Sequence, residues 1–286
     1  MRMRAERLVP FAFVLPSIAF LAVLVLLPTL QTFLLSVTTA SGGFTLDMFR
    51  HLFADLNFTE TLRNTLLLLF IVVLLQVALA LAMALLINSR FPGHTWFQYL
   101  CVLPLAVSDL AAGLIWLAAL TDRGYLNSTL QSLGIIGQPV LWLSFDNPAG
   151  LLAAIVIAES WRTTAIVLFV LLGGLQLVPR ELFDAAEVFG ANRLRRVIHV
   201  LFPLLRPSLQ SALVVRSILV LPTFAVVFVL AGRNMTVLAG EAYTWSAANH
   251  NDQVAAAYAA VILGLSLIGI IGYAGIVSRR EAELEL

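Results

Sequence analysis

The sequence predicts an all-α polytopic membrane protein with six transmembrane helices and one polar hairpin between the fourth and fifth of them. Three observations support this fold class. Of the 286 residues, 60% are hydrophobic and 12% are charged, which lies outside the range of soluble globular proteins. Apolar runs of about 20 residues, the length that crosses a bilayer, recur along the chain. The one long polar stretch between such runs is 180–207.

The predicted spans follow one another with short or moderate connections. The first begins after Arg2, Arg4 and Arg7; it is far longer than the apolar part of a secretory signal and has no clear cleavage site, so we predict an uncleaved span. The loop that follows is expected to hold a short surface helix around residues 46–53. In order, the spans are 9–37, 62–87, 96–120, 151–177, 209–230 and 254–277, within a single transmembrane domain over 1–286.

The polar stretch 180–207 is predicted to form two short helices at a membrane surface. In the first, Leu182, Ala185, Ala186 and Phe189 recur at helical spacing and make an apolar face, whereas Asp184 and Glu187 share another face. Gly190 is expected to end or bend this helix. The second helix carries Arg193, Arg195, Arg196 and His199 off its apolar face, and we expect Pro203 to end it.

Arginine asymmetry predicts the orientation in the membrane. If the N-terminus is inside, the inner segments hold eleven arginines and the outer segments hold four. The inner ones are Arg2, Arg4, Arg7, Arg90, Arg180, Arg193, Arg195, Arg196, Arg206, Arg279 and Arg280; the outer ones are Arg50, Arg63, Arg123 and Arg233. Both termini and the hairpin are therefore predicted to be cytoplasmic.

Several classes of function are excluded by composition. Every one of the seventeen basic residues is an arginine, so the lysine of a Walker A phosphate loop does not exist in this chain. There is one cysteine, Cys101, and the four histidines match no metal-ligand spacing. We therefore expect no catalytic residue, no metal and no cofactor in this chain, and no nucleic-acid partner. If ATP drives the protein, another polypeptide binds it.

The hairpin residues resemble a known motif. Asp184-Ala185-Ala186, three residues, Gly190, nine residues, Val200, one residue, Phe202-Pro203 is similar to the Glu-Ala-Ala-x3-Gly-x9-Ile-x-Leu-Pro loop of bacterial ABC-importer permeases. Asp184, Val200 and Phe202 depart from the pattern but keep its charge or apolarity. The resemblance implies a type I importer permease fold, in which this loop docks in a cleft of the ATPase. It assigns Asp184, Ala185, Ala186, Glu187, Gly190 and Pro203 to ATPase coupling.

Shorter matches along the chain resemble the maltose and glycerol-phosphate type of carbohydrate permease. They are Arg63-Asn64-Thr65, Leu103-Pro104, Gly124-Tyr125-Leu126-Asn127 and Glu159-Ser160-Trp161-Arg162. At 232–236 many relatives have a Gly-Gly-Pro turn, and this chain has Gly-Arg-Asn-Met-Thr. The resemblance implies a second homologous permease, two ATPase subunits that hold ATP and magnesium, an extracytoplasmic solute-binding protein or lipoprotein, and a bacterial cytoplasmic membrane.

Ionisable residues inside predicted spans mark pathways or structural pairs, because each costs about 2.5–3.5 kcal/mol to insert. Glu159 and Arg162 are three residues apart on one helix and can pair; the pair is either structural or part of a substrate path. Trp161 beside them either packs in the core or stacks on a sugar ring. Arg216 is expected to reach toward the cytoplasmic interface.

Asp109 is the fourth of these residues. It follows Pro104 in a span that also contains Gly113, so a broken helix with an exposed carboxylate is one reading and a bend without ligand contact is the other.

Two functions remain open from the sequence. One is the permease subunit of an ATP-driven importer for a sugar or related polar solute, coupled to its ATPase through 180–207. The other is an ion-coupled secondary transporter in which Asp109 or Glu159 carries a proton. The sequence does not name the solute.

Overall fold

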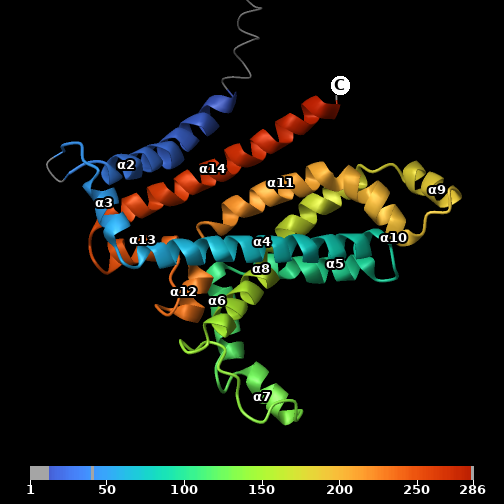
Figure 1. Ribbon diagram of the computed structural model, residues 1–286, viewed down its shortest axis with the longest axis horizontal. Coiled ribbons are helices and arrows are strands. Elements are labelled where there is room, and N and C mark those ends of the chain that lie inside the picture. The colour runs from blue at the N-terminus through green and yellow to red at the C-terminus, as the bar shows by residue number, and fades with distance from the viewer. Residues whose placement is uncertain (1–12, 40–41, 285–286) are drawn as a thin grey trace, which may run out of the picture. The chain divides into compact units, whose positions relative to one another are not determined.

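The computed structural model describes residues 13–39 and 42–284, with the side chains of 180, 193 and 273–284 outside the description. The predicted start of the first span and Arg2, Arg4 and Arg7 therefore lie outside the described residues. In the described residues the regular secondary structure is helical, joined by turns and loops, with one isolated bridge between Thr38 and Phe44 (Figure 1). It divides into two compact units, residues 1–59 with 241–263 and residues 60–240 with 264–286.

The smaller unit contains a helical span over Phe13–Ser36, α3 (Asp47–Ala54), most of α13 (Leu238–Ala247) and the first turns of α14 (Asp252–Leu284). The span is α-helical apart from a π-helix at Ala22–Leu26, and its last part is α2 (Leu27–Ser36). Two hydrogen bonds join distant parts of this unit: the Tyr258 hydroxyl with Asp55, and the Gln253 amide to the Thr38 carbonyl. The surface helix predicted at 46–53 is confirmed by α3.

The larger unit contains the remaining helices, packed around α8. They are α4 (Phe58–Asn88), α5 (His94–Val102), a 3-10 turn (Leu103–Ala106), α6 (Asp109–Leu120), α7 (Tyr125–Ser132), α8 (Pro148–Gln176), α9 (Arg180–Val188), α10 (Arg193–Arg196), a π-helix (Val197–Leu201), α11 (Phe202–Val220) and α12 (Ala225–Ala231). Taken over both units, the described residues contain five helices long and apolar enough to cross a membrane, or up to six if one bent pair counts as a span.

α8 is the axis of this unit because its side chains are buried along nearly its whole length. One apolar cluster joins the first half of α8 to α4, α6 and α12, and a second joins its last turns to α4 and α11. Two glycines allow close approach. A Cβ at Gly174 would collide with Ser208 of α11, and a Cβ at Gly113 of α6 would collide with Val229 of α12.

The third expected span, 96–120, is broken. His94–Ala106 and Asp109–Ser132 meet at 103°. Pro104 lies in the 3-10 turn, and the Ser108 hydroxyl accepts a hydrogen bond from Ala111 N–H, so α6 starts afresh with its own N-cap. The break therefore comes from Pro104 and Ser108, whereas Gly113 lies within α6 and allows its close packing against α12.

The expectation that Pro203 ends the second hairpin helix is wrong. A continuous helix runs over Leu194–Val220. The π-helix just before Pro203 widens the turn, and Phe202 N–H donates five residues back to Val197 O. A wider turn accommodates the ring and the missing N–H of proline. The helix instead ends near Pro222, so the fifth expected span, 209–230, is divided between α11 and α12.

Two loops on the side of the larger unit away from α9 are fixed by buried polar side chains. Asn127 of α7 is fully buried; its amide donates to the carbonyls of Thr121 and Val140, and its oxygen accepts from Val140 N–H. Asn64 donates to the Thr236 carbonyl, and the Thr65 hydroxyl accepts from Leu238 N–H. The Gly-Arg-Asn-Met-Thr segment is thus held against the start of α4.

Replacing the buried Asn127 by alanine should destabilise the protein by about 1–3 kcal/mol, because its three part-buried hydrogen bonds to the backbone of Thr121 and Val140 are lost together. Thermal unfolding of the purified chain in detergent measures the change. Asn249→Ala, at an exposed loop position, is the control and should leave the melting temperature unchanged. Equal melting temperatures for the two variants would contradict the role assigned to Asn127.

Candidate functional site

The ionisable side chains of the predicted spans come together in one network inside the larger unit. Arg216 of α11 lies with its Nη2 2.6 Å from Glu159 Oε1 of α8, and its Nε donates to Gln76 Oε1 of α4. The Gln76 amide in turn donates to Thr163 Oγ1 at 2.7 Å and to the Glu159 carbonyl at 3.1 Å. Three helices are therefore tied together by one buried ion pair and its hydrogen bonds.

A second ion pair extends the network to α6. Arg162 Nη2 is 2.7 Å from Asp109 Oδ1 and 3.5 Å from Glu159 Oε1. Exposure of the side chains rises along the series, from 1% and 2% for Arg216 and Glu159 to 14% for Arg162 and 45% for Asp109. The network thus has a buried end at Arg216 and Glu159 and an exposed end at Asp109.

The expectation that Arg216 reaches toward the cytoplasmic interface is wrong. Its guanidinium turns inward because Glu159 and Gln76 supply the acceptors that a buried cation requires. Two carboxylates and two guanidiniums make the network neutral as a whole. Sequence reasoning missed Gln76, although an amide in the middle of the apolar run 62–87 was the signal that could have identified it.

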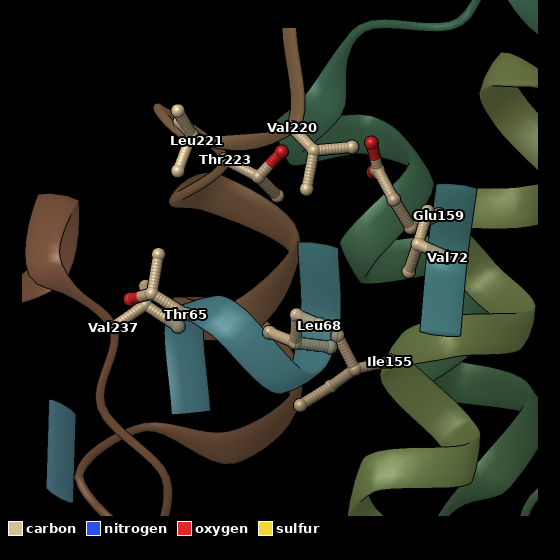
Figure 2. Close-up of a pocket in the computed structure, with 9 residues that line it drawn as sticks. All are labelled: Thr65, Leu68, Val72, Ile155, Glu159, Val220, Leu221, Thr223 and Val237. Carbon is tan, nitrogen blue, oxygen red and sulfur yellow. The ribbon is translucent and has the colours of Figure 1, made fainter. Parts of the chain in front are cut away.

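Glu159 also borders a small cavity of about 10 Å³, roughly the space that one water molecule requires. Figure 2 shows Glu159 as the one ionisable side chain among the residues that line it, which are otherwise apolar or threonine. The second carboxylate oxygen of Glu159, the Arg162 Nε, the Ser160 hydroxyl and the Trp116 indole N–H are buried without a hydrogen-bond partner among the described residues. Unmatched polar atoms therefore concentrate around this network.

Trp161 lies at the accessible side of the network. Its ring meets Trp116 edge to face, with centroids 6.1 Å apart, and 38% of Trp161 is exposed. Trp161 therefore packs on Trp116 while part of the residue remains exposed, and stacking on a sugar ring stays a prediction.

The hairpin begins with α9, whose end is built by Gly190. Gly190 has φ +77°, its N–H donates to Glu187 O, and Ala191 N–H donates to Ala186 O. These bonds form a Schellman motif, which glycine favours because it enters the left-handed region without strain. Asn192 then caps the next helix by accepting from Arg195 N–H.

An ion pair holds the two arms of the hairpin together. Arg196 Nη1 lies 2.6 Å from Glu187 Oε2. Glu187 is thus engaged within the chain, whereas Asp184 is exposed and makes no ion pair with any described side chain. Of the two carboxylates that the sequence places on one face, Glu187 is therefore engaged in an ion pair with Arg196, and Asp184 is the more accessible to another molecule.

The apolar face predicted for α9 is turned outward over most of its length. Val188 and Phe189 are 87% and 89% exposed, and Leu182 and Ala185 are exposed as well. Phe183 points the other way and packs against the cluster formed by α4, α8 and α11. Ala186 is half-buried, and Pro203 is exposed in the first turn of α11.

Within 13–39 and 42–284, no group of three or more His, Cys, Asp or Glu side chains is arranged to hold a metal ion. The arrangement offers two things instead: a charged, partly accessible network between helices and a protruding helix with an apolar tip.

Comparisons with known proteins cover most of the chain. The family model described as "Binding-protein-dependent transport system inner membrane component" matches residues 52–281. The chain is 32% identical over 238 residues to the sulfoquinovosyl glycerol transport system permease protein SmoG of Agrobacterium fabrum, covering 79% of this chain and 75% of that protein. It is 36% identical over 164 residues to the trehalose/maltose transport system permease protein MalF of Thermococcus litoralis, covering 57% and 54%.

A solved structure shares the fold. It is a bacterial alginate ABC transporter in complex with an alginate pentasaccharide-bound periplasmic protein. The TM-score is 0.84 at 19% identity, and the match covers 98% of this chain and 97% of that one. The likeness confirms the predicted fold class.

Glu159→Gln should lower the free energy of unfolding by about 3–5 kcal/mol, because it leaves the Arg216 guanidinium buried without its counter-charge. The double variant Glu159→Gln/Arg216→Gln should recover most of that loss. Asp109→Asn, at the 45% exposed end, should change stability by about 1 kcal/mol or less. Chemical unfolding of the purified chain measures all three, and strictly additive effects of the Glu159 and Arg216 changes would argue against the pair.

Proposed function

Because the chain belongs to the family of inner membrane components of binding-protein-dependent transport systems, we propose that it is the permease subunit of an ATP-driven importer for a sugar or related polar solute. ATP and magnesium are held by a partner ATPase, and α9 with its Gly190 turn is the surface on which that ATPase acts. The observation that carries the proposal is the outward apolar tip of α9 beside an exposed Asp184 that forms no ion pair with the described side chains.

Binding to a protein explains the exposed residues of this tip better than binding to a lipid surface. Anionic headgroups would repel Asp184, whereas a protein cleft can supply a cation for it. Val188 and Phe189 offer large apolar surface whose burial stabilises an interface. Ala185 and Ala186 keep the helix narrow, so a cleft can approach its backbone.

Motion of α9 has a continuous route to the charged network. The Arg196–Glu187 pair joins α9 to the helix over Leu194–Val220, and Arg216 lies near the far end of that helix. Arg216 in turn grips Glu159 and Gln76. We propose that ATP binding selects one of two packings of these helices and so alternates access to the pathway.

The solute class rests on the relatives, whose names refer to sulfoquinovosyl glycerol and to trehalose and maltose, and on the network. Asp109 and Trp161 are its accessible members, and they combine a hydrogen-bond acceptor with an aromatic ring, a pair suited to a sugar. Glu159 and Arg216 support them from behind. We assign Arg162 to the boundary, because it bridges Asp109 and Glu159.

Further parts of the proposal concern assembly and orientation. A second related permease, two ATPase subunits and an extracytoplasmic solute-binding protein complete the importer, and both termini and the hairpin lie in the bacterial cytoplasm. The arginine asymmetry supports this orientation. For the alternative of a proton carrier, both candidates are engaged: Glu159 with Arg216 and Asp109 with Arg162.

Asp184→Lys should leave the chain in the membrane but reduce copurification of the ATPase by at least about tenfold, because it places a cation where the partner's cation is expected. Asp122→Lys makes the same charge change at an exposed position of a different loop and should not alter copurification. Undiminished transport in the Asp184 variant would contradict docking on α9.

Asp109→Asn and Trp161→Ala should each weaken solute stimulation of ATP hydrolysis, with a shift in half-maximal solute concentration of about tenfold for Asp109→Asn. The compensated double variant Glu159→Gln/Arg216→Gln should keep the solute response, because it preserves a hydrogen-bonded support without charge. Measurements use the assembled importer with its binding protein. An unchanged response in both single variants would remove Asp109 and Trp161 from the path.

A further inference from the structure

Two hollows in the larger unit lie away from the charged network, at the end of the bundle that carries α9. One, of about 430 Å³, lies between the end of α4, the start of α5 and the last turns of α8. A second of similar volume shares Asn88, Arg90, Leu175 and Gln176 with the first and extends to Phe183 of α9. The proposed function uses neither.

The polar side of the first hollow is rich in hydrogen-bond donors and contains a single full charge. The polar side chains are those of Asn88, Arg90, His94, Gln98 and Gln176, and none of the described residues that line either hollow carries a carboxylate. Arg90 is exposed and has no ion pair with the described side chains. The lining therefore suits an anion with several acceptor oxygens, and the planar arginine fork matches phosphate geometry in particular.

The other side of the same hollow is apolar. Phe169 and Leu172 of α8 line it beside the amides. Asn88 is the last residue of α4 and Gln176 is the last of α8, so the hollow lies at the level where two apolar spans end. Phosphate and hydrocarbon meet at that level in a bilayer.

We infer that this hollow binds the phosphate headgroup of an anionic phospholipid, with Arg90 as the principal contact and with the acyl chain against Phe169 and Leu172. Free inorganic phosphate offers the same oxygens but has nothing to place on the apolar wall. Basic pockets between transmembrane helices on the cytoplasmic side are suited to anionic headgroups. Because the second hollow reaches Phe183, a bound headgroup lies beside the helix that we assign to ATPase docking.

The test compares Arg90→Asn with a matched control. Arg90 has φ +53°, a left-handed conformation that asparagine adopts more readily than arginine, so the substitution removes charge without adding backbone strain. Arg206→Gln removes one positive charge from an exposed position in the first turns of α11, outside both hollows. Gln176→Leu removes one donor from the facing wall and serves as a second, independent probe.

Native mass spectrometry of the full chain, titrated in detergent with phosphatidylglycerol or phosphatidylcholine, counts bound lipid. We expect wild type to prefer phosphatidylglycerol, Arg90→Asn to weaken its binding by about tenfold, Gln176→Leu to weaken it less, and Arg206→Gln to match wild type. A parallel titration with inorganic phosphate separates the two sources of phosphate.

Four results would overturn the proposal. The first is equal binding of the two lipids by wild type, and the second is an Arg90→Asn variant that binds phosphatidylglycerol as wild type does. The third is binding of inorganic phosphate that depends on Arg90 and fully displaces phosphatidylglycerol, which would assign the hollow to a free anion. Loss of the bound lipid when the second permease assembles would likewise identify the hollow as part of a protein interface and sink the lipid assignment.

Discussion

The buried pair of Arg216 and Glu159 is the constraint on which the larger unit depends. Neither charge is stable alone inside the bundle, so the helices that carry them must stay in register. Gln76 extends this requirement to α4, and Arg162 extends it to α6 through Asp109. Apolar packing around α8 brings the same helices together but is not directional. The ionic network therefore specifies which faces of the helices meet.

The helix over Leu194–Val220 contains both the second arm of the hairpin and Arg216. It therefore connects the proposed docking surface on α9 to the charged network. The Arg196–Glu187 ion pair joins α9 to the start of that helix, and Phe183 of α9 packs against the apolar cluster of α4, α8 and α11. At its tip, in contrast, Val188 and Phe189 are almost fully exposed among the described residues. One side of α9 packs on the bundle, and the other is the side that we propose for the partner.

Sequence patterns predicted what depends on one helix at a time. Apolar runs predicted most of the long helices, although 96–120 is broken and 209–230 is divided between α11 and α12. Gly190 predicted the end of α9 because its left-handed conformation is local. Contacts between helices were less predictable. The spacing within α8 suggested the Glu159–Arg162 pair, which lies at 3.5 Å. It could not show that Arg216 of another helix lies closer to Glu159, at 2.6 Å. Pro203 led to the wrong prediction of a helix end. The π-helix before it accommodates the proline ring and the missing N–H, and such a turn has no clear sequence signal. The break beside Asp109 agrees with one of the two readings of the sequence, and Pro104 lies in the turn that makes it. Gly113 instead allows close approach to Val229 of α12, a contact between helices that the sequence pattern does not reveal.

The graded exposure of the network bears on how one cluster can serve both stability and transport. A fully buried ionic cluster would hold the helices but meet no solute, and a fully exposed one would be screened by water and would hold little. Here burial is nearly complete at Arg216 and falls to about half at Asp109, with Arg162 between them. A solute that hydrogen-bonds Asp109 would compete for the acceptor that Arg162 uses, and Arg162 has a second acceptor in Glu159 at 3.5 Å. Such an exchange leaves no guanidinium unpaired, so the accessible end can change partners while the buried end keeps the helices joined.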